Sequence, residues 1–122
     1  MFEASVQMSF SAAHMLRAYK GKCENMHGHN WKVQIFVVKE ELDKLGMVMD
    51  FTKLKNVLRK VLDNLDHKFL NNISYFKKIN PTSENIARHI YIQLCKKLKI
   101  KNNVSLRVCV WETENSCATY YE

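Results

Sequence analysis

Three histidines near the start of the chain have the spacing of metal ligands. His27 and His29 are separated by one residue, so in a β-strand their side chains project from the same face. His14 ends an earlier alternating segment, and a paired strand would bring it beside the other two. Three buried imidazoles leave several ring nitrogens in need of partners, and one metal ion satisfies a nitrogen on each. Three nitrogen ligands leave a fourth position open, which is typical of a catalytic zinc site.

A cysteine lies close to this histidine pair. Cys23 precedes His27 by four residues and falls in a stretch, residues 15–26, that has no periodicity and predicts a long loop. One interpretation is a reactive thiolate, made more acidic by a nearby metal or positive charge. The other is a small buried residue with no chemical role. Its position in a long loop favours the reactive thiolate, because such loops in small domains are often functional.

Two further groups carry potential chemistry. Glu112 interrupts an apolar strand face, where a carboxylate needs a partner or a ligand unless the strand end is exposed. Asp66 is followed directly by His67. This pair is either an ordinary helix terminus or an imidazole whose tautomer and basicity are set by the carboxylate. His89 falls beside an apolar helical stripe, and no role is assigned to it.

Two strands are predicted to position the histidines. Residues 2–14 alternate between apolar and polar side chains, with His14 on the apolar face, which predicts a half-buried strand. A second alternating segment begins near His27 and continues to residue 37. If these strands pair antiparallel, the end of the first lies beside the start of the second. His14 then neighbours His27 and His29 on one face of the sheet.

The remaining helices and strands are predicted from changes in the spacing of apolar residues along the chain. Apolar residues recur at helical spacing over residues 54–65, after a potential N-cap at Asp50. A second helical stripe covers residues 87–98, capped by Thr82 or Ser83. Strands are predicted near 104–113 and 117–121, joined by a short hairpin. The order ββααββ predicts an α+β fold with a four-stranded antiparallel sheet and two helices on one face. Residues 1–122 are expected to form a single domain.

Composition narrows the class of protein. The net charge is +7, which indicates either a lysine-rich solvated surface or attraction to an anionic ligand. The lysines are scattered and form no basic run. No segment has the length of a membrane span or the pattern of a signal peptide. The four cysteines are therefore expected to be reduced thiols in a cytoplasmic protein. No role is assigned to three of them, Cys95, Cys109 and Cys117.

Several short motifs, taken together, resemble the 6-pyruvoyl-tetrahydropterin synthase family, and within it the 6-carboxy-tetrahydropterin synthase branch of queuosine (7-deazaguanine) biosynthesis. The resemblance covers essentially the whole chain. The motifs are Phe10-Ser11-Ala12-Ala13-His14, Cys23-x-x-x-His27-Gly28-His29-Asn30, Met49-Asp50-Phe51, Leu65-Asp66-His67, Asn80-Pro81-Thr82-Ser83-Glu84-Asn85 and Trp111-Glu112-Thr113.

The resemblance implies the tunnelling fold, or T-fold, of that family. In this fold three ββααββ subunits close their sheets into a twelve-stranded barrel, and two such trimers stack into a homohexamer. Closing the barrel would also remove the sheet edges that a lone subunit exposes. Active sites of the family lie at subunit interfaces, so the catalytic groups need not meet within one chain.

The resemblance also implies a metal, a base and a substrate. His14, His27 and His29 would bind Zn²⁺, and Cys23 would be the general base. The implied substrate is 7,8-dihydroneopterin triphosphate. The enzyme would be a lyase that eliminates triphosphate, cleaves the side chain and releases acetaldehyde and 6-carboxy-5,6,7,8-tetrahydropterin.

Two more roles come from the same resemblance. Asp66 and His67 would complete the proton-transfer set, supplied by a neighbouring subunit. Glu112 would anchor the pterin by accepting hydrogen bonds from its amino group and ring N–H, an arrangement that suits a bidentate carboxylate.

Two alternatives remain, one concerning the product of the reaction and one concerning the class of protein. The four-residue spacing from Cys23 to His27 is similar to the carboxy branch, whereas animal-type pyruvoyl synthases typically have a longer insertion there. The first alternative is a 6-pyruvoyl-tetrahydropterin synthase of the biopterin pathway. The second is a zinc-stabilised module that binds nucleic acid, with Cys23 as a fourth ligand. The resemblance favours an enzyme with a small-molecule substrate and with neither nucleic acid nor membrane as partner.

Overall fold

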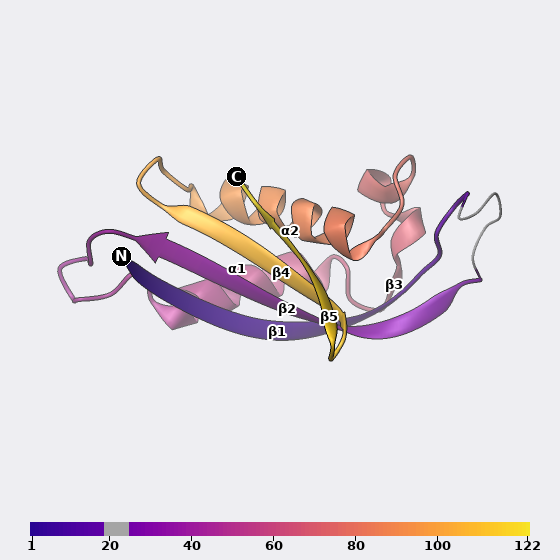
Figure 1. Ribbon diagram of the computed structural model, residues 1–122, viewed down its shortest axis with the longest axis horizontal. Coiled ribbons are helices and arrows are strands. Elements are labelled where there is room, and N and C mark those ends of the chain that lie inside the picture. The colour runs from indigo at the N-terminus through magenta and orange to yellow at the C-terminus, as the bar shows by residue number, and fades with distance from the viewer. Residues whose placement is uncertain (19–24) are drawn as a thin grey trace.

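Long strands and two helices make up most of the computed structural model, which describes residues 1–18 and 25–122 (Figure 1). Two short 3₁₀ turns, Leu70–Asn72 and Ser74–Phe76, precede the second helix. The elements in chain order are β1 (Phe2–His14), β2 (His27–Lys39), α1 (Phe51–Asp63), β3 (Lys68–Phe69), α2 (Ser83–Leu98), β4 (Ser105–Thr113) and β5 (Ser116–Tyr121).

The strands form one sheet in the order β3-β1-β2-β4-β5. β1 and β2 pair antiparallel from Phe2 opposite Lys39 to His14 opposite His27, as the alternating pattern predicted. The prediction of four purely antiparallel strands is wrong in one respect, because β3 adds a fifth strand parallel to β1. The chain returns from α1 along the outer edge of β1, where the His67 amide donates to the Ser11 carbonyl at 2.6 Å. β3 has only two residues, too few to show an alternating pattern in the sequence.

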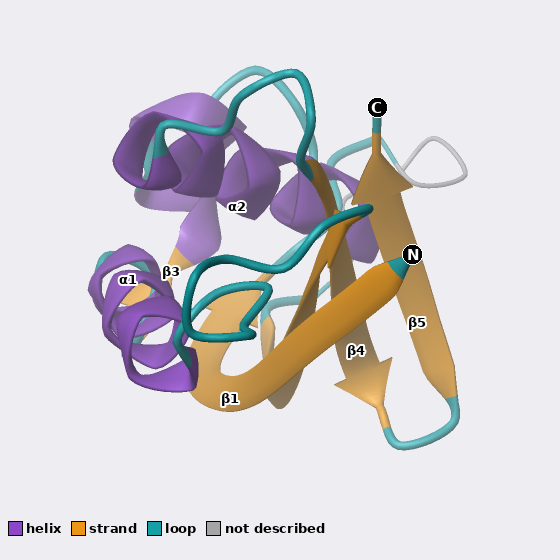
Figure 2. Cartoon of the chain, turned by 90° about the vertical axis from the view of Figure 1, so that its left-hand side faces the viewer, coloured by secondary structure: helices purple, strands orange, loops and turns teal. Residues whose placement is uncertain are grey.

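Both helices cover the same face of the sheet, which confirms the predicted α+β layering (Figure 2). α1 packs on β1, and α2 packs on β4 and β5. The core lies between these layers. It contains the alternate residues that the strand patterns predicted to be buried, such as Trp31 and Ile35, and the helical stripes represented by Leu58 and Ile90.

The predicted helix caps are present. The Asp50 carboxylate accepts from the Thr52 amide at 2.7 Å, and the Thr82 hydroxyl accepts from the Asn85 amide at 3.2 Å. α2 ends at Leu98, the last residue of the predicted stripe, and Lys99 after it adopts the left-handed conformation. The Thr82 cap determines where α2 begins, and this end of the helix lies beside the histidine cluster described below.

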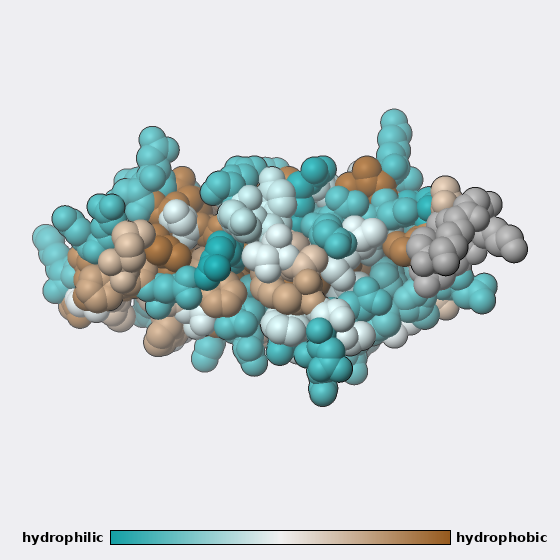
Figure 3. All heavy atoms as spheres, viewed as in Figure 1, coloured by the Kyte–Doolittle hydropathy of each residue, from teal (hydrophilic) through white to brown (hydrophobic). Residues whose placement is uncertain are grey.

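The opposite face of the sheet carries polar and aromatic pairs. The Lys32 ammonium lies 4.4 Å from the centre of the Trp111 ring, and Arg107 lies over Phe36 and binds Glu3 at 2.6 Å. Hydrophilic side chains cover most of the surface visible in Figure 3, and the apolar patches between them are small. Among the described residues, no helix is long and apolar enough to cross a membrane. Three cysteines, Cys95, Cys109 and Cys117, are free.

Candidate metal centre

The strand pairing brings three histidines together. His14 lies directly opposite His27 in the β1–β2 ladder, and His29 lies opposite Ala12. All three rings are on the face that the helices cover. The ring centres of His14 and His27 are 4.5 Å apart, and those of His27 and His29 are 4.7 Å apart. His14 is only 2 % exposed, so its ring nitrogens must find partners inside the protein.

Backbone carbonyls determine the tautomers of two of these rings. His14 Nδ1 lies 2.8 Å from the carbonyl oxygen of Pro81, and His27 Nδ1 lies 2.9 Å from that of Asn25. A carbonyl oxygen can only accept, so each Nδ1 carries the proton and donates it. In the neutral rings, each Nε2 is therefore left with a lone pair.

These two lone pairs face each other. His14 Nε2 and His27 Nε2 are 3.0 Å apart, a distance at which two acceptors repel unless a proton or a cation lies between them. Two imidazoles on one tetrahedral zinc ion, at ~2.0–2.1 Å from it, have nitrogens about 3.3 Å apart. Oriented imidazoles whose other nitrogen donates to a carbonyl are typical of metal ligands. The residues present therefore fit a divalent metal ion.

A carboxylate completes the cluster. Glu112, near the end of β4, places Oε1 3.1 Å from His29 Nε2. One ligand atom from each of His14, His27, His29 and Glu112 lies within 4.8 Å of the others. Three imidazoles are a donor set that zinc accepts, and the Glu112 carboxylate lies directly beside them. Glu112 interrupts an apolar strand face and was expected to need a partner. That partner is the His29 imidazole of the same cluster.

The cluster opens into two adjoining pockets beside the start of α2. The Ser83 hydroxyl lies 3.4 Å from Glu112 Oε2 and donates to it. One pocket, of about 250 Å³, contains the histidine pair from β1 and β2, and the other, of about 260 Å³, extends along the β4–β5 turn. Both are lined by Ser83, Glu84 and Glu112. A ligand in this space would contact Glu112, His14 and His27 at once.

The predicted Asp66–His67 pair is formed, but at a different edge of the sheet. Asp66 Oδ2 lies 3.0 Å from His67 Nδ1, while Asp66 Oδ1 accepts from the Ser11 amide at 2.8 Å. The hydrogen bond from the Ser11 amide is the main reason that the pKa of Asp66 is lowered, and the His67 ring contributes further. His67 has a left-handed backbone, with φ of 56°, and its side chain is 82 % exposed.

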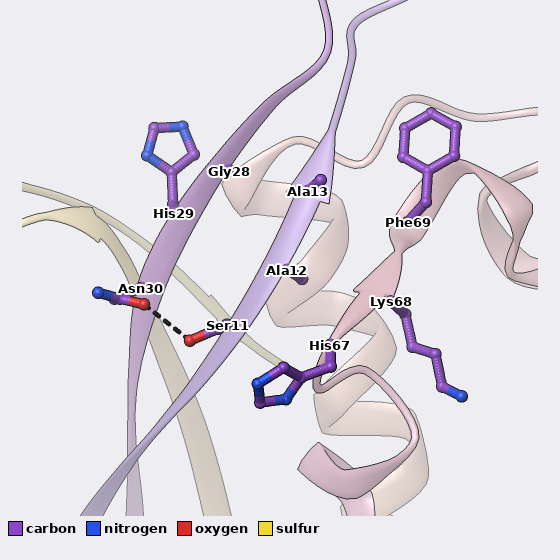
Figure 4. A pocket seen from close by; sticks show the side chains of 9 residues that line it. All are labelled: Ser11, Ala12, Ala13, Gly28, His29, Asn30, His67, Lys68 and Phe69. Carbon is purple, nitrogen blue, oxygen red and sulfur yellow. Dashed lines mark hydrogen bonds between the residues drawn. The ribbon is translucent and has the colours of Figure 1, made fainter.

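Figure 4 shows the surroundings of His67. His67 lines a shallow pocket with Lys68 and Phe69, and Ser11 and Asn30 are joined by a hydrogen bond of 2.7 Å between their side chains. His29 also lines this pocket, but neither Asp66 nor His67 belongs to the four-residue metal cluster. The structure thus brings His14, His27, His29 and Glu112 together and places the Asp66–His67 pair apart from them, at the β1–β3 edge.

Other parts of the site either lie outside the described residues or gave no signal in the sequence. The predicted base, Cys23, lies outside the described residues. The carbonyls of Asn25 and Pro81 orient the histidines, yet backbone groups leave no residue-type signal. Pro81 directly precedes the predicted helix cap Thr82 and lies in one of the family motifs, which was the only indication of its importance.

Comparisons with known proteins point to one family of synthases over nearly the whole chain. Residues 3–122 match the family model described as 6-pyruvoyl tetrahydropterin synthase. A 6-carboxy-5,6,7,8-tetrahydropterin synthase of Haemophilus influenzae is 34% identical, with 100% of both chains covered. The human 6-pyruvoyl tetrahydrobiopterin synthase is 36% identical, over 97% of this chain and 90% of its own.

A solved structure gives the same result. The 6-pyruvoyl tetrahydropterin synthase of Caenorhabditis elegans has a TM-score of 0.86 and 32% identity to this protein, covering 99% of this chain and 95% of that one. Sequence, fold and the convergence of the three histidines in one cluster thus agree, and the chain belongs to the 6-pyruvoyl tetrahydropterin synthase family.

Proposed function

We propose that the protein is a zinc-dependent 6-carboxy-5,6,7,8-tetrahydropterin synthase of queuosine biosynthesis. It would convert 7,8-dihydroneopterin triphosphate to 6-carboxytetrahydropterin, acetaldehyde and triphosphate. The observation that carries this proposal is the pair of Nε2 atoms 3.0 Å apart, on two histidines whose Nδ1 atoms are both bound to backbone carbonyls. The name of the Haemophilus influenzae relative supports the choice of reaction. The net charge of +7 suits a substrate with a triphosphate tail.

The proposed metal site uses His14, His27 and His29. Zinc bound there would acidify the side-chain hydroxyls of the substrate and stabilise negative charge that develops beside them. The carbonyls of Pro81 and Asn25 hold two of the rings in place and increase the basicity of Nε2.

Glu112 would orient the pterin. If His29 Nε2 bound the metal ion, its contact of 3.1 Å with Glu112 Oε1 would be released and the carboxylate would be available to the substrate. Its two oxygens would accept from the amino group and the ring N–H of the pterin, a bidentate arrangement. The Ser83 hydroxyl, at 3.4 Å from Oε2, helps to fix the plane of the carboxylate.

Proton transfer would be shared between Cys23 and the Asp66–His67 pair. The lowered pKa of Asp66 keeps it ionised near neutral pH, where it accepts from His67 Nδ1 and leaves Nε2 to exchange protons. His67 is exposed and lies outside the metal cluster, so this pair would act on the site of a neighbouring subunit.

A homohexamer built from two trimers is part of the same proposal. Within the described residues, β5 has one neighbouring strand, and most of the outer edge of β1 has none. Pairing these edges between subunits would satisfy their backbone groups. The free thiols of the described cysteines suit the cytoplasmic location that this pathway implies.

The second candidate is a 6-pyruvoyl-tetrahydropterin synthase on the same scaffold. It is favoured by the human and Caenorhabditis elegans relatives, which are as similar to this chain as the bacterial one. Incubating the purified protein with 7,8-dihydroneopterin triphosphate separates the two. Acetaldehyde and the 6-carboxy product support the first reaction, and a 6-pyruvoyl product supports the second. A zinc-loaded protein that releases no triphosphate would refute both.

A further inference from the structure

Two asparagine side chains join the residues after β1 to the segment before α2. Asn71 accepts from the Met15 amide at 2.9 Å and donates to the Met15 carbonyl at 2.9 Å. Asn80 accepts from the Arg17 amide at 2.8 Å and donates to the Arg17 carbonyl at 3.0 Å. Each side-chain amide therefore pairs with both backbone groups of one residue, as a neighbouring strand would.

The side chain of Arg17 completes this network. Its two terminal nitrogens donate to the carbonyls of Ile79 and Asn71, each at 3.2 Å. We call the side chains of Arg17, Asn71 and Asn80 the amide clasp. Asn71 is 7 % exposed, and among the described residues it and His14 are the buried polar side chains. An asparagine so buried is costly unless its hydrogen bonds are made, so the clasp is held in one geometry.

The clasp encloses the contact that orients His14. Met15 directly follows His14, and Asn80 directly precedes Pro81, whose carbonyl accepts from His14 Nδ1 at 2.8 Å. The Asn80 carbonyl in turn accepts from the Asn85 side chain at 2.9 Å, which fixes this segment to α2. His14 and Pro81 are thus each held by side chains that do not belong to the four-residue metal cluster.

We propose that Asn71 and Asn80 are positioning residues for the metal centre, an inference that rests on the proposed metal-dependent function. They hold the Pro81 carbonyl against His14 Nδ1, which selects the tautomer whose Nε2 is unprotonated and ready to bind a metal ion. Which nitrogen of a histidine carries the proton is set by the hydrogen bond that the other nitrogen makes. Losing such an outer partner typically weakens metal binding by about 10- to 100-fold.

Isosteric substitutions test this role. Asn71→Asp and Asn80→Asp replace the donating Nδ2 by oxygen, so the variant side chain opposes a backbone carbonyl with another acceptor. Asn72→Asp is the matched control, because it makes the same chemical change at an exposed neighbouring position. The added negative charge alone would favour a cation. Weaker binding in the two clasp variants therefore cannot come from charge.

The measurement is zinc affinity, by competition with a chromophoric chelator, on each purified protein. We expect the dissociation constant to rise by about 10- to 100-fold in Asn71→Asp and Asn80→Asp, and by no more than about twofold in the control. Circular dichroism of the metal-free proteins identifies a variant that has failed to fold, and the other clasp variant then carries the test. Folded clasp variants that bind zinc like the control would overturn the proposal.

A second readout does not depend on metal binding. The ¹⁵N chemical shifts of the His14 ring in the metal-free protein report its tautomer directly. We expect an Nδ1–H ring in the unmodified protein and in Asn72→Asp, and a shift towards Nε2–H in the clasp variants. Unchanged tautomers in folded clasp variants would overturn the proposal. If the unmodified protein bound no zinc, the proposed function would fail, while these shifts would still decide whether the clasp orients His14.

Discussion

Replacing His27 should have opposite effects on the metal-free and zinc-bound forms. In the metal-free protein, His27→Ala removes a contact of 3.0 Å between two acceptors and one exposed hydrogen bond to the Asn25 carbonyl. The hydrogen bond contributes about 0.5–1.5 kcal/mol, and loss of the unfavourable contact offsets it. We therefore expect the free energy of unfolding of the metal-free variant to change by less than about 1 kcal/mol.

The zinc-bound forms should differ much more. Free zinc at 100 times its dissociation constant stabilises a protein by about 2.7 kcal/mol. If His27→Ala weakens zinc binding about 100-fold, the same zinc concentration stabilises the variant by only about 0.4 kcal/mol. For a chain of this size, 1 kcal/mol corresponds to roughly 3–5 °C in the melting temperature, so zinc should raise the melting temperature by about 8–13 °C in the unmodified protein and by about 1–2 °C in the variant.

The assay is thermal unfolding with and without zinc at fixed free-metal concentration. His67→Ala is the matched control, because it removes an exposed histidine outside the metal cluster and should retain the full zinc-induced increase. An equal increase in His27→Ala and the unmodified protein would show that the cluster does not bind zinc through His27. A metal-free variant destabilised by several kcal/mol would contradict the offset described above.

Three further outcomes are expected. Glu112→Gln should lower kcat/KM by about 10- to 100-fold, because a charge-assisted hydrogen bond is lost, while the zinc content by elemental analysis stays that of the exposed control Glu114→Gln. Cys23→Ala should reduce turnover by about 10²–10⁴-fold with an unchanged circular dichroism spectrum, and unchanged turnover would remove the proposed base. Asp66→Asn should be less stable than the unmodified protein near neutral pH. Because the pKa of Asp66 is lowered from 3.8 in the folded state, this difference should persist above pH 3.8 and shrink as the pH falls through the folded pKa. Urea midpoints from pH 6 to pH 2 measure it, and a constant difference would contradict the assignment.

The convergence of the histidines was predictable because strand geometry is simple. Alternation placed His14 with the apolar residues of its segment, and antiparallel pairing placed the end of that segment beside His27. A slip of one residue would have moved every apolar side chain to the other face, so burial fixes the register. The N-caps at Asp50 and Thr82 were predictable for a similar reason, since side-chain chemistry alone identifies a cap.

Features that depend on distant segments could not be predicted in this way. The two residues of β3 are ordered by the edge of β1, and their own pattern carries no strand signal. The contact between His14 and the Pro81 carbonyl joins positions 67 residues apart. The apolar strand face indicated that Glu112 needs a partner, but only the three-dimensional structure identifies that partner as His29.

The order of the site residues along the chain has a consequence for biosynthesis. All three histidines lie within the first 29 residues, whereas the Pro81 carbonyl and Glu112 come much later. At about 5–20 residues per second, roughly 80 residues separate the synthesis of His29 from that of Glu112 by about 4–16 s. A nascent β1–β2 hairpin would bear the three imidazoles and the Asn25 carbonyl, but it would lack the Pro81 carbonyl that orients His14. The three imidazoles, the Pro81 carbonyl and Glu112 are therefore present together only after residue 112 has been made.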